Sequence, residues 1–127
     1  MTRCQSVTET FFREIQTMTK PTRVACVRLT VLVDSAVKWH GVPLYSALVK
    51  RCQESDIAGA TVISCAEGYG SHRTLHSSRL FALSDNLPMQ VQVIERKENL
   101  DHLLEVLADM LGQRLVTLEE VEVLHWE

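Results

Sequence analysis

The chain has 127 residues, of which 46% are hydrophobic and 23% charged, and its formal net charge is -3. This composition predicts one globular domain and argues against nucleic-acid binding, because sequence-independent affinity for phosphate backbones needs clustered Lys and Arg. Every apolar stretch falls short of the roughly 20 residues that span a bilayer, and no secretion signal is recognisable, so we expect a cytoplasmic protein without membrane insertion.

Residues 1–22 are predicted to form an N-terminal extension, followed by one domain over residues 23–127. The extension fits either a short helix or a frayed tail, because terminal segments order only when they dock. The apolar residues that would share one side of such a helix are Val7, Phe11, Ile15 and Met18.

The first half of the domain predicts a strand, a helix and a second strand. Most residues from Val24 to Val33 are β-branched or aliphatic, with Val27, Leu29, Val31 and Val33 on one face and Arg28 and Thr30 opposite, as in a strand. After a turn at His40–Gly41, apolar residues recur at helical spacing from Pro43 to Ser55. Small and β-branched residues from Ala60 to Ala66 indicate the second strand.

The second half begins with a long exposed connection from Gly68 to Ser78, which has no apolar period. A third strand opens after Pro88, where apolar residues alternate with glutamines. A leucine stripe then predicts a second helix, with Asn99 as its N-cap and Gly112 at its end. After a turn at Val116–Thr117, the fourth strand is expected from Val121 to Trp126.

The order βαββαβ predicts an α+β, ferredoxin-like fold, a four-stranded antiparallel sheet with two helices on one face. The second face of the sheet would also carry apolar side chains, from residues such as Cys26, Leu32 and Leu124. Apolar groups on an uncovered face are unfavourable in water, so we expect a homo-oligomer. The four cysteines are scattered and form no CxxC pair, which favours reduced thiols over a disulfide framework.

Several segments resemble an uncharacterised family of PII-like proteins. They are HGVPLYSALV, DIAGATVISCAEGYG from Asp56 to Gly70, HSSRL from His76, LSDNLPMQVQVI from Leu83 to Ile94, and the terminal LEEVEVLHW. The resemblance runs from about Val24 to the end of the chain. It implies a signalling or regulatory protein rather than an enzyme, a trimer that binds an adenine nucleotide between subunits, and a loop after strand two that contacts a protein partner such as a transporter or an enzyme.

The resemblance also implies a ligand-binding wall along strand two and the loop that follows it. Glycines there would permit close backbone approach and positive φ, so that N–H groups could point at an anion. The residues carried over from the PII pattern are Gly59 and Thr61, then Gly68, Tyr69, Gly70 and His72, with Arg79 as a nearby cation.

The second wall departs from the PII pattern. PII proteins hold nucleotide phosphates with a Gly- and Lys-rich loop after helix two, but the stretch from Gly112 to Val123 has one glycine, one arginine and three glutamates. A nucleotide with fewer phosphates, another small anion or no nucleotide at all are the alternatives. Arg73 and Arg114 are further cations near this wall by sequence.

Two constellations could suggest other chemistry. His72 and His76 have HxxxH spacing, but without a third metal ligand they are interpreted as solvated loop histidines. Ser77 and Asp85 could join a histidine in a nucleophilic site, yet no strained turn around a serine supports one. The acidic run from Glu119 to Glu122 is read as a solvated strand face rather than a cation site.

Two rival functions remain from the residues alone. The first is a small ferredoxin-like enzyme with a pocket on the sheet face and His40 or His125 as acid or base, since one fold hosts many functions. The second is a ligand-free interaction module. A deep cavity within one subunit would favour the enzyme, and a cleft between subunits beside the loop would favour the sensor.

Overall fold

The computed structural model describes residues 8–10, 20–69, 76–77 and 86–126. The chain divides into two compact units, the larger from Ala25 to Val121 and the smaller made of Met1–Val24 with Glu122–Glu127. In the smaller unit, Arg23 Nε lies 3.7 Å from Glu122 Oε2, and residues 8–10 are helical. The predicted helix from Val7 to Met18 otherwise lies outside the described residues.

A four-stranded sheet organises the larger unit. Its strands are β1 (Thr22–Asp34), β4 (Gly59–Ser64), β7 (Pro88–Arg96) and β8 (Val116–His125), in the order β4-β7-β1-β8. β7 runs antiparallel to both of its neighbours. On the far side of β1, the Leu32 N–H donates to the Leu115 carbonyl (3.0 Å) and Arg28 pairs with Glu119, which is antiparallel register again.

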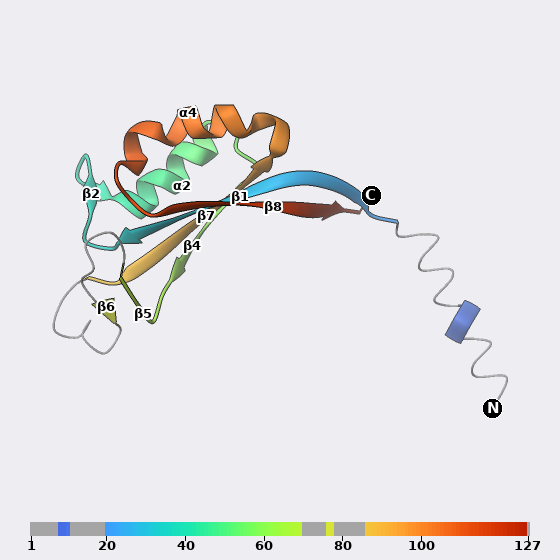
Figure 1. Ribbon diagram of the computed structural model, residues 1–127, viewed down its shortest axis with the longest axis horizontal. Helices are drawn as coiled ribbons and strands as arrows, with labels where there is room; N and C mark the ends of the chain where they lie inside the picture. The colour runs from blue at the N-terminus through green and yellow to red at the C-terminus, as the bar shows by residue number, and fades with distance from the viewer. Residues whose placement is uncertain (1–7, 11–19, 70–75, 78–85, 127) are drawn as a thin grey trace. The chain divides into compact units, whose positions relative to one another are not determined.

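Two helices cover one face of this sheet, α2 (Leu44–Glu54) and α4 (Leu100–Leu111), the latter preceded by the short helix η1 (Lys97–Asn99) (Figure 1). The βαββαβ prediction is therefore confirmed as an α+β ferredoxin-like arrangement. Neither described helix combines the length and apolar character needed to cross a membrane.

The core lies between the helices and the sheet because the apolar periods match on both sides. Every second side chain of β1 points toward the helices. The buried side chains of α2 and α4 are three or four residues apart and point toward the sheet. The fully buried residues at this interface are Leu29, Val31, Val33, Leu44, Leu48, Cys52, Val91, Val93, Leu103, Leu107 and Met110.

A β-hairpin that was not predicted joins β1 to α2. Its strands are β2 (Lys38–Trp39) and β3 (Val42–Pro43), and the turn residues His40 and Gly41 have φ of 49° and 87°. Positive φ at both central positions is the geometry of a type I′ turn, which suits the twist of paired strands. The Leu44 N–H donates to the Val37 carbonyl (2.9 Å), so the hairpin is tied to the first residue of α2.

The ends of the helices follow their sequence signals in part. α2 closes with Asp56 at φ 57°, and the Ile57 N–H donates to the Cys52 carbonyl (3.0 Å), as in a Schellman motif. Asn99 occupies the N-cap position of α4, but its side chain makes no capping hydrogen bond. Gly112 ends α4 with φ 55°, as its residue type predicts.

The last strand begins five residues earlier than predicted. β8 starts at Val116, where a turn was expected. Two of its glutamates form ion pairs with residues of other elements, which stabilises this part of the strand. Glu119 accepts two hydrogen bonds from the Arg28 guanidinium (2.8 and 3.0 Å), and Lys97 donates to Glu120 (2.8 Å). The hydrogen bond and charge of Lys97 lower the pKa of Glu120.

The long exposed connection predicted from Gly68 to Ser78 includes part of a short strand pair that was not predicted. β4 ends at Ser64 rather than Ala66, and Glu67–Gly68 (β5) then pairs antiparallel with His76–Ser77 (β6). Short strands of two residues carry too little periodicity to be recognised from sequence.

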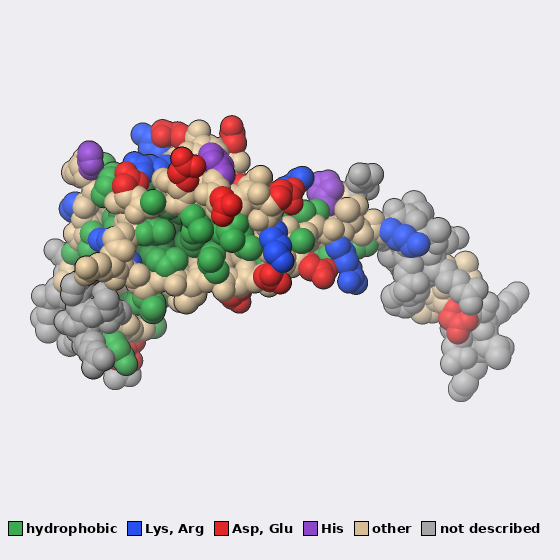
Figure 2. Space-filling view, turned by 45° about the horizontal axis from the view of Figure 1, so that its top comes forward, with side chains coloured by type: hydrophobic (Ala, Val, Ile, Leu, Met, Phe, Trp, Pro, Cys, Tyr) green, Lys and Arg blue, Asp and Glu red, His purple; other side chains and the backbone are tan. Residues whose placement is uncertain are grey.

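The face of the sheet that α2 and α4 leave uncovered carries both apolar and polar side chains. The registers place Thr30, Gln92 and Thr61 side by side, and Leu32, Gln90 and Ile63 in the next row. Ile63 is 42% exposed. This face is therefore a mixture of apolar and hydrogen-bonding side chains. Figure 2, in which the helix side is tilted toward the reader, shows hydrophobic side chains gathered in the middle of the visible face and bordered by charged ones.

Cys52 is a buried thiol on α2 that we expect to be inert. Burial, and secondarily the charge of the buried Glu95, raise its pKa from 9.0 to about 11. The folded state therefore keeps its proton where the unfolded state loses it, so this contribution to stability is complete below pH 9 and disappears as the pH rises toward 11.

Peptide mapping after iodoacetamide treatment at pH 8 should thus find Cys65, which is half-buried, labelled well before Cys52. Urea unfolding from pH 8 to 11 should show a loss of stability that is smaller in a Cys52→Ala variant. Labelling of Cys52 at the rate of Cys65 in the folded protein would contradict the burial of its thiol.

Candidate functional site

The predicted ligand wall lies along β4, an edge strand of the sheet. Gly59 opens this strand opposite Ile94, and Thr61 is exposed on the uncovered face opposite Gln92. Gly68 and Tyr69 lie beyond the other end of β4, and Tyr69 is 63% exposed. Gly70, His72 and Arg79 lie outside the described residues.

The wall is extended rather than gathered. From Gly59 to Ser64 the strand advances by about 17 Å at roughly 3.3 Å per residue, so Gly59 and Gly68 stand at opposite ends of β4. A ligand would meet these residues along the edge of the sheet.

The prediction of positive φ, one of the two properties expected of these glycines, is wrong for both described glycines of the wall. Among the described glycines, positive φ occurs at Gly41 and Gly112, and neither Gly59 nor Gly68 has it. A Cβ at Gly59 would meet nothing within 4 Å, and one at Gly68 would make an ordinary 3.8 Å contact with Pro88. Packing inside one chain therefore requires no glycine at Gly59, and the open space beside it is available to a molecule from outside.

The base of the loop is held by hydrogen bonds to β1 and β7. The Ser35 N–H donates to the Leu87 carbonyl and the Leu87 N–H donates to Ser35 Oγ, both at 2.8 Å. The Cys65 N–H donates to the Pro88 carbonyl (2.9 Å). These hydrogen bonds fix Cys65, where the loop begins, and Leu87, where it ends, at the same end of the sheet.

The predicted second wall stands at the opposite edge of the same sheet. Arg114 follows α4 and precedes β8, and both its N–H (3.2 Å) and its guanidinium (3.3 Å) donate to the Leu111 carbonyl. Among the described residues it pairs with no carboxylate. Since three inter-strand spacings separate β8 from β4, the two edges are about 14 Å apart. One chain cannot close both walls around a small ligand.

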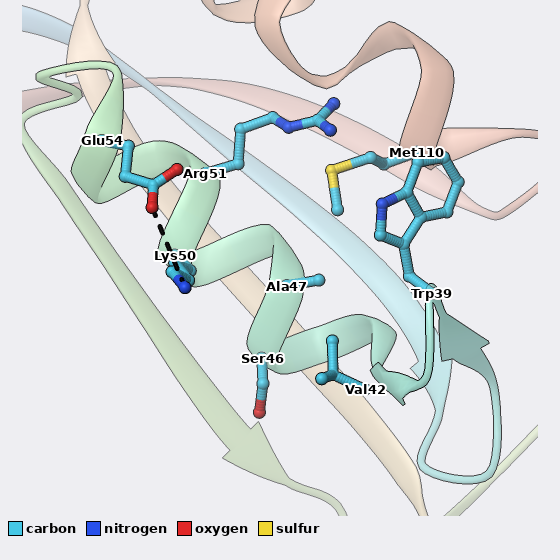
Figure 3. Close-up of a pocket in the computed structure, with 8 residues that line it drawn as sticks. All are labelled: Trp39, Val42, Ser46, Ala47, Lys50, Arg51, Glu54 and Met110. Carbon is cyan, nitrogen blue, oxygen red and sulfur yellow. Dashed lines mark ion pairs between the residues drawn. The ribbon is translucent and has the colours of Figure 1, made fainter.

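A separate cavity of about 330 Å³ lies within the larger unit, between the hairpin and the helices. Its lining residues come from the hairpin, α2 and the last turn of α4. They are Trp39, Val42, Ser46, Ala47, Lys50, Arg51, Glu54 and Met110 (Figure 3).

Sequence reasoning missed this cavity because it depends on the unpredicted hairpin. The histidines proposed for an enzyme do not line it: His40 stacks on Trp39 with ring centroids 4.8 Å apart, and His125 is exposed on β8. In the part of the chain that the structure describes, no three His, Cys, Asp or Glu residues gather as metal ligands would.

This chain is similar in sequence to proteins of one uncharacterised family. The chain matches the family DUF190, described as "Uncharacterized ACR, COG1993", over residues 26–123. A UPF0166 protein of Aquifex aeolicus (strain VF5) is 32% identical over 99 residues, which cover 76% of this chain and 91% of the relative. A second UPF0166 protein of that organism is 32% identical over 79 residues, 62% of this chain and 80% of the relative.

Solved structures with the same fold include CPII, a nitrogen regulatory PII-like protein from Thiomonas intermedia K12. Its complex with ADP, AMP and bicarbonate has a TM-score of 0.60 at 16% identity, over 80% of this chain and 91% of CPII. Its apo form has a TM-score of 0.55 at 13% identity, over 84% of this chain and 99% of CPII. The fold is thus PII-like, as the sequence resemblance predicted.

Proposed function

This chain belongs to the DUF190 family of uncharacterised proteins, and from its PII-like fold and divided site we propose that it is a signalling protein that senses a small ligand where subunits meet. The observation that carries the proposal is the separation of the two walls, one on the β4 edge and one beside Arg114 at the β8 edge. The β4 edge of one copy can lie against the β8 edge of another copy that is related to it by rotation. Closed homo-oligomers form shared sites between subunits in this way.

The ligand we propose is an adenine nucleotide with one or two phosphates. CPII, which shares the fold, has been solved with ADP and AMP. Gly59, Thr61, Gly68, Tyr69, Gly70 and His72 would line the nucleotide along the β4 edge, with Arg79 and Arg114 toward the phosphates. A third phosphate is disfavoured because the stretch from Gly112 to Val123 has one arginine and no lysine, and so offers few cations to bind it.

The output we propose is a change in the loop after β4. Its base is fixed by Ser35 and Cys65, so a ligand at the β4 edge would act on the segment that projects from this base. Binding energy that differs between two loop arrangements shifts their populations, and a protein partner such as a transporter or an enzyme would read the difference. We propose a homotrimer in the cytoplasm with no catalytic step of its own.

Calorimetric titration and thermal unfolding with AMP, ADP and ATP test this function. We expect ADP or AMP to bind more tightly than ATP. At a free nucleotide concentration of 100 times the dissociation constant, the bound nucleotide should stabilise the protein by about 2.7 kcal/mol and raise the melting temperature by several degrees. Light scattering in the same samples should report three chains per particle. If all three nucleotides give neither heat nor stabilisation, the sensor function is wrong.

A further inference from the structure

The cavity beside Trp39 has an apolar interior. Met110, which is 2% exposed, and Ala47 form its floor, and Trp39 and Val42 stand beside them. A volume of about 330 Å³ is at the small end of the range for ligand pockets, which is about 300–1,000 Å³. The interior therefore suits one compact apolar group.

The wall of the cavity is held in place before any ligand arrives. The two positive-φ residues of the hairpin turn, His40 and Gly41, position Trp39. The Arg51 guanidinium lies 5.8 Å from the Trp39 ring centroid, donates to the Val106 carbonyl (3.3 Å) and pairs with Asp109. Its charge is thus already matched, so Arg51 serves as a wall rather than as a partner for an anion.

The rim carries one positive and one negative group side by side. Lys50 Nζ and Glu54 Oε1 are 4.0 Å apart, one helical turn from each other, and their side chains are 75% and 65% exposed (Figure 3). This distance exceeds that of a hydrogen bond, and an exposed pair of this kind contributes little to stability. Both groups can therefore turn to a ligand at little cost.

We propose that this cavity binds a free α-amino acid with an apolar side chain. The ligand's carboxylate would pair with Lys50 and its ammonium group with Glu54, while its side chain enters between Trp39, Val42 and Met110. An apolar interior beneath adjacent opposite charges complements such a zwitterion in both charge and polarity. The site lies within one chain and would give the protein a second input, independent of the proposed nucleotide.

The fluorescence of Trp39 tests the proposal directly. The chain has two tryptophans, and a Trp126→Phe variant leaves Trp39 as the sole reporter. We expect leucine and methionine to change this fluorescence saturably, and glycine to have no effect because it lacks the apolar group. N-acetyl-leucine and leucinamide, which each lose one charge, should bind about tenfold more weakly or worse, because each loses one ion pair.

Variants locate the binding. In the Trp126→Phe background, Lys50→Gln and Glu54→Gln should each weaken leucine binding, whereas Lys97→Gln, at the exposed pair with Glu120, should leave it unchanged. Ala47→Leu should fill the cavity and abolish binding while circular dichroism shows a folded protein. Titration of the Trp126→Phe protein and its variants with ADP tests the proposed function separately. Intact ADP binding without leucine binding in the Trp126→Phe protein would contradict only the amino-acid site.

Two results would overturn the proposal. One is the absence of any saturable response to leucine or methionine at millimolar concentration in the folded protein. The other is equal affinity for leucine and its two singly charged derivatives, which would mean that the rim charges play no part.

Discussion

Leu48→Ala should lower the free energy of unfolding by about 2–5 kcal/mol, the usual cost of deleting a buried leucine side chain. Leu48 is 0% exposed and lies at the centre of α2, packed against the sheet and the second helix. Truncation leaves a void that close-packed neighbours fill only in part, and the lost contacts are spread over both layers of the domain. Because small domains are stable by only about 5–15 kcal/mol, this single change should remove a large share of the total.

Leu118→Ala is the matched control, since the same atoms are removed from a residue that is 48% exposed on β8. We expect its cost to be about 1 kcal/mol or less, because about half of that residue's surface already contacts water. Urea titrations of both variants at the same protein concentration measure the difference. Equal losses would contradict the location of the core between α2, α4 and the sheet.

The parts of the fold that were predictable are those with a strong apolar period. β1 alternates buried and half-buried residues from Val27 to Asp34, and α4 carries a leucine stripe opposite acidic residues, so each segment buries one face as its pattern requires. In these elements the secondary structure favoured by the local sequence is also the one that tertiary packing stabilises. Their order along the chain then leaves few topologies, of which the split βαβ arrangement is the observed one.

The errors occur where partners distant in sequence decide the structure. β8 was begun too late because Val116–Thr117 was read as a turn, whereas the strand runs through it and its Glu119 and Glu120 pair with Arg28 and Lys97. The hairpin before α2 was missed because two-residue strands have no period, although His40–Gly41 was recognised as a turn. The cavity depends on that hairpin, so its lining could not be assembled from sequence.

The candidate nucleotide site was predictable only as a set of residues, through the resemblance to PII-like proteins. The resemblance implied two walls of a ligand cleft. In the structure β4 stretches Gly59 and Gly68 apart, and Arg114 lies at the other edge of the sheet. Which surfaces of neighbouring copies meet is set by shape complementarity between whole molecules, which no local pattern encodes.

Subunit mixing tests the shared site most directly. Thr61→Tyr should block the wall on β4, and Arg114→Gln should remove the cation at the opposite edge, so each variant alone should bind ADP at least tenfold more weakly than the unmodified chain. Both changes should leave the fold intact, because Thr61 is exposed on a strand, where tyrosine is favoured, and Arg114 lies outside the buried core.

When the two variants are unfolded together and refolded as a mixture, ADP binding should return at roughly a quarter of the junctions, since each wall has about even odds of coming from an intact copy. The same variants refolded separately and then combined provide the control, and calorimetry counts the restored sites. Recovery in the mixture is the result that a site shared between copies predicts. No recovery in mixed particles, with wild-type ADP binding intact, would show that each chain builds its site alone and would contradict the account.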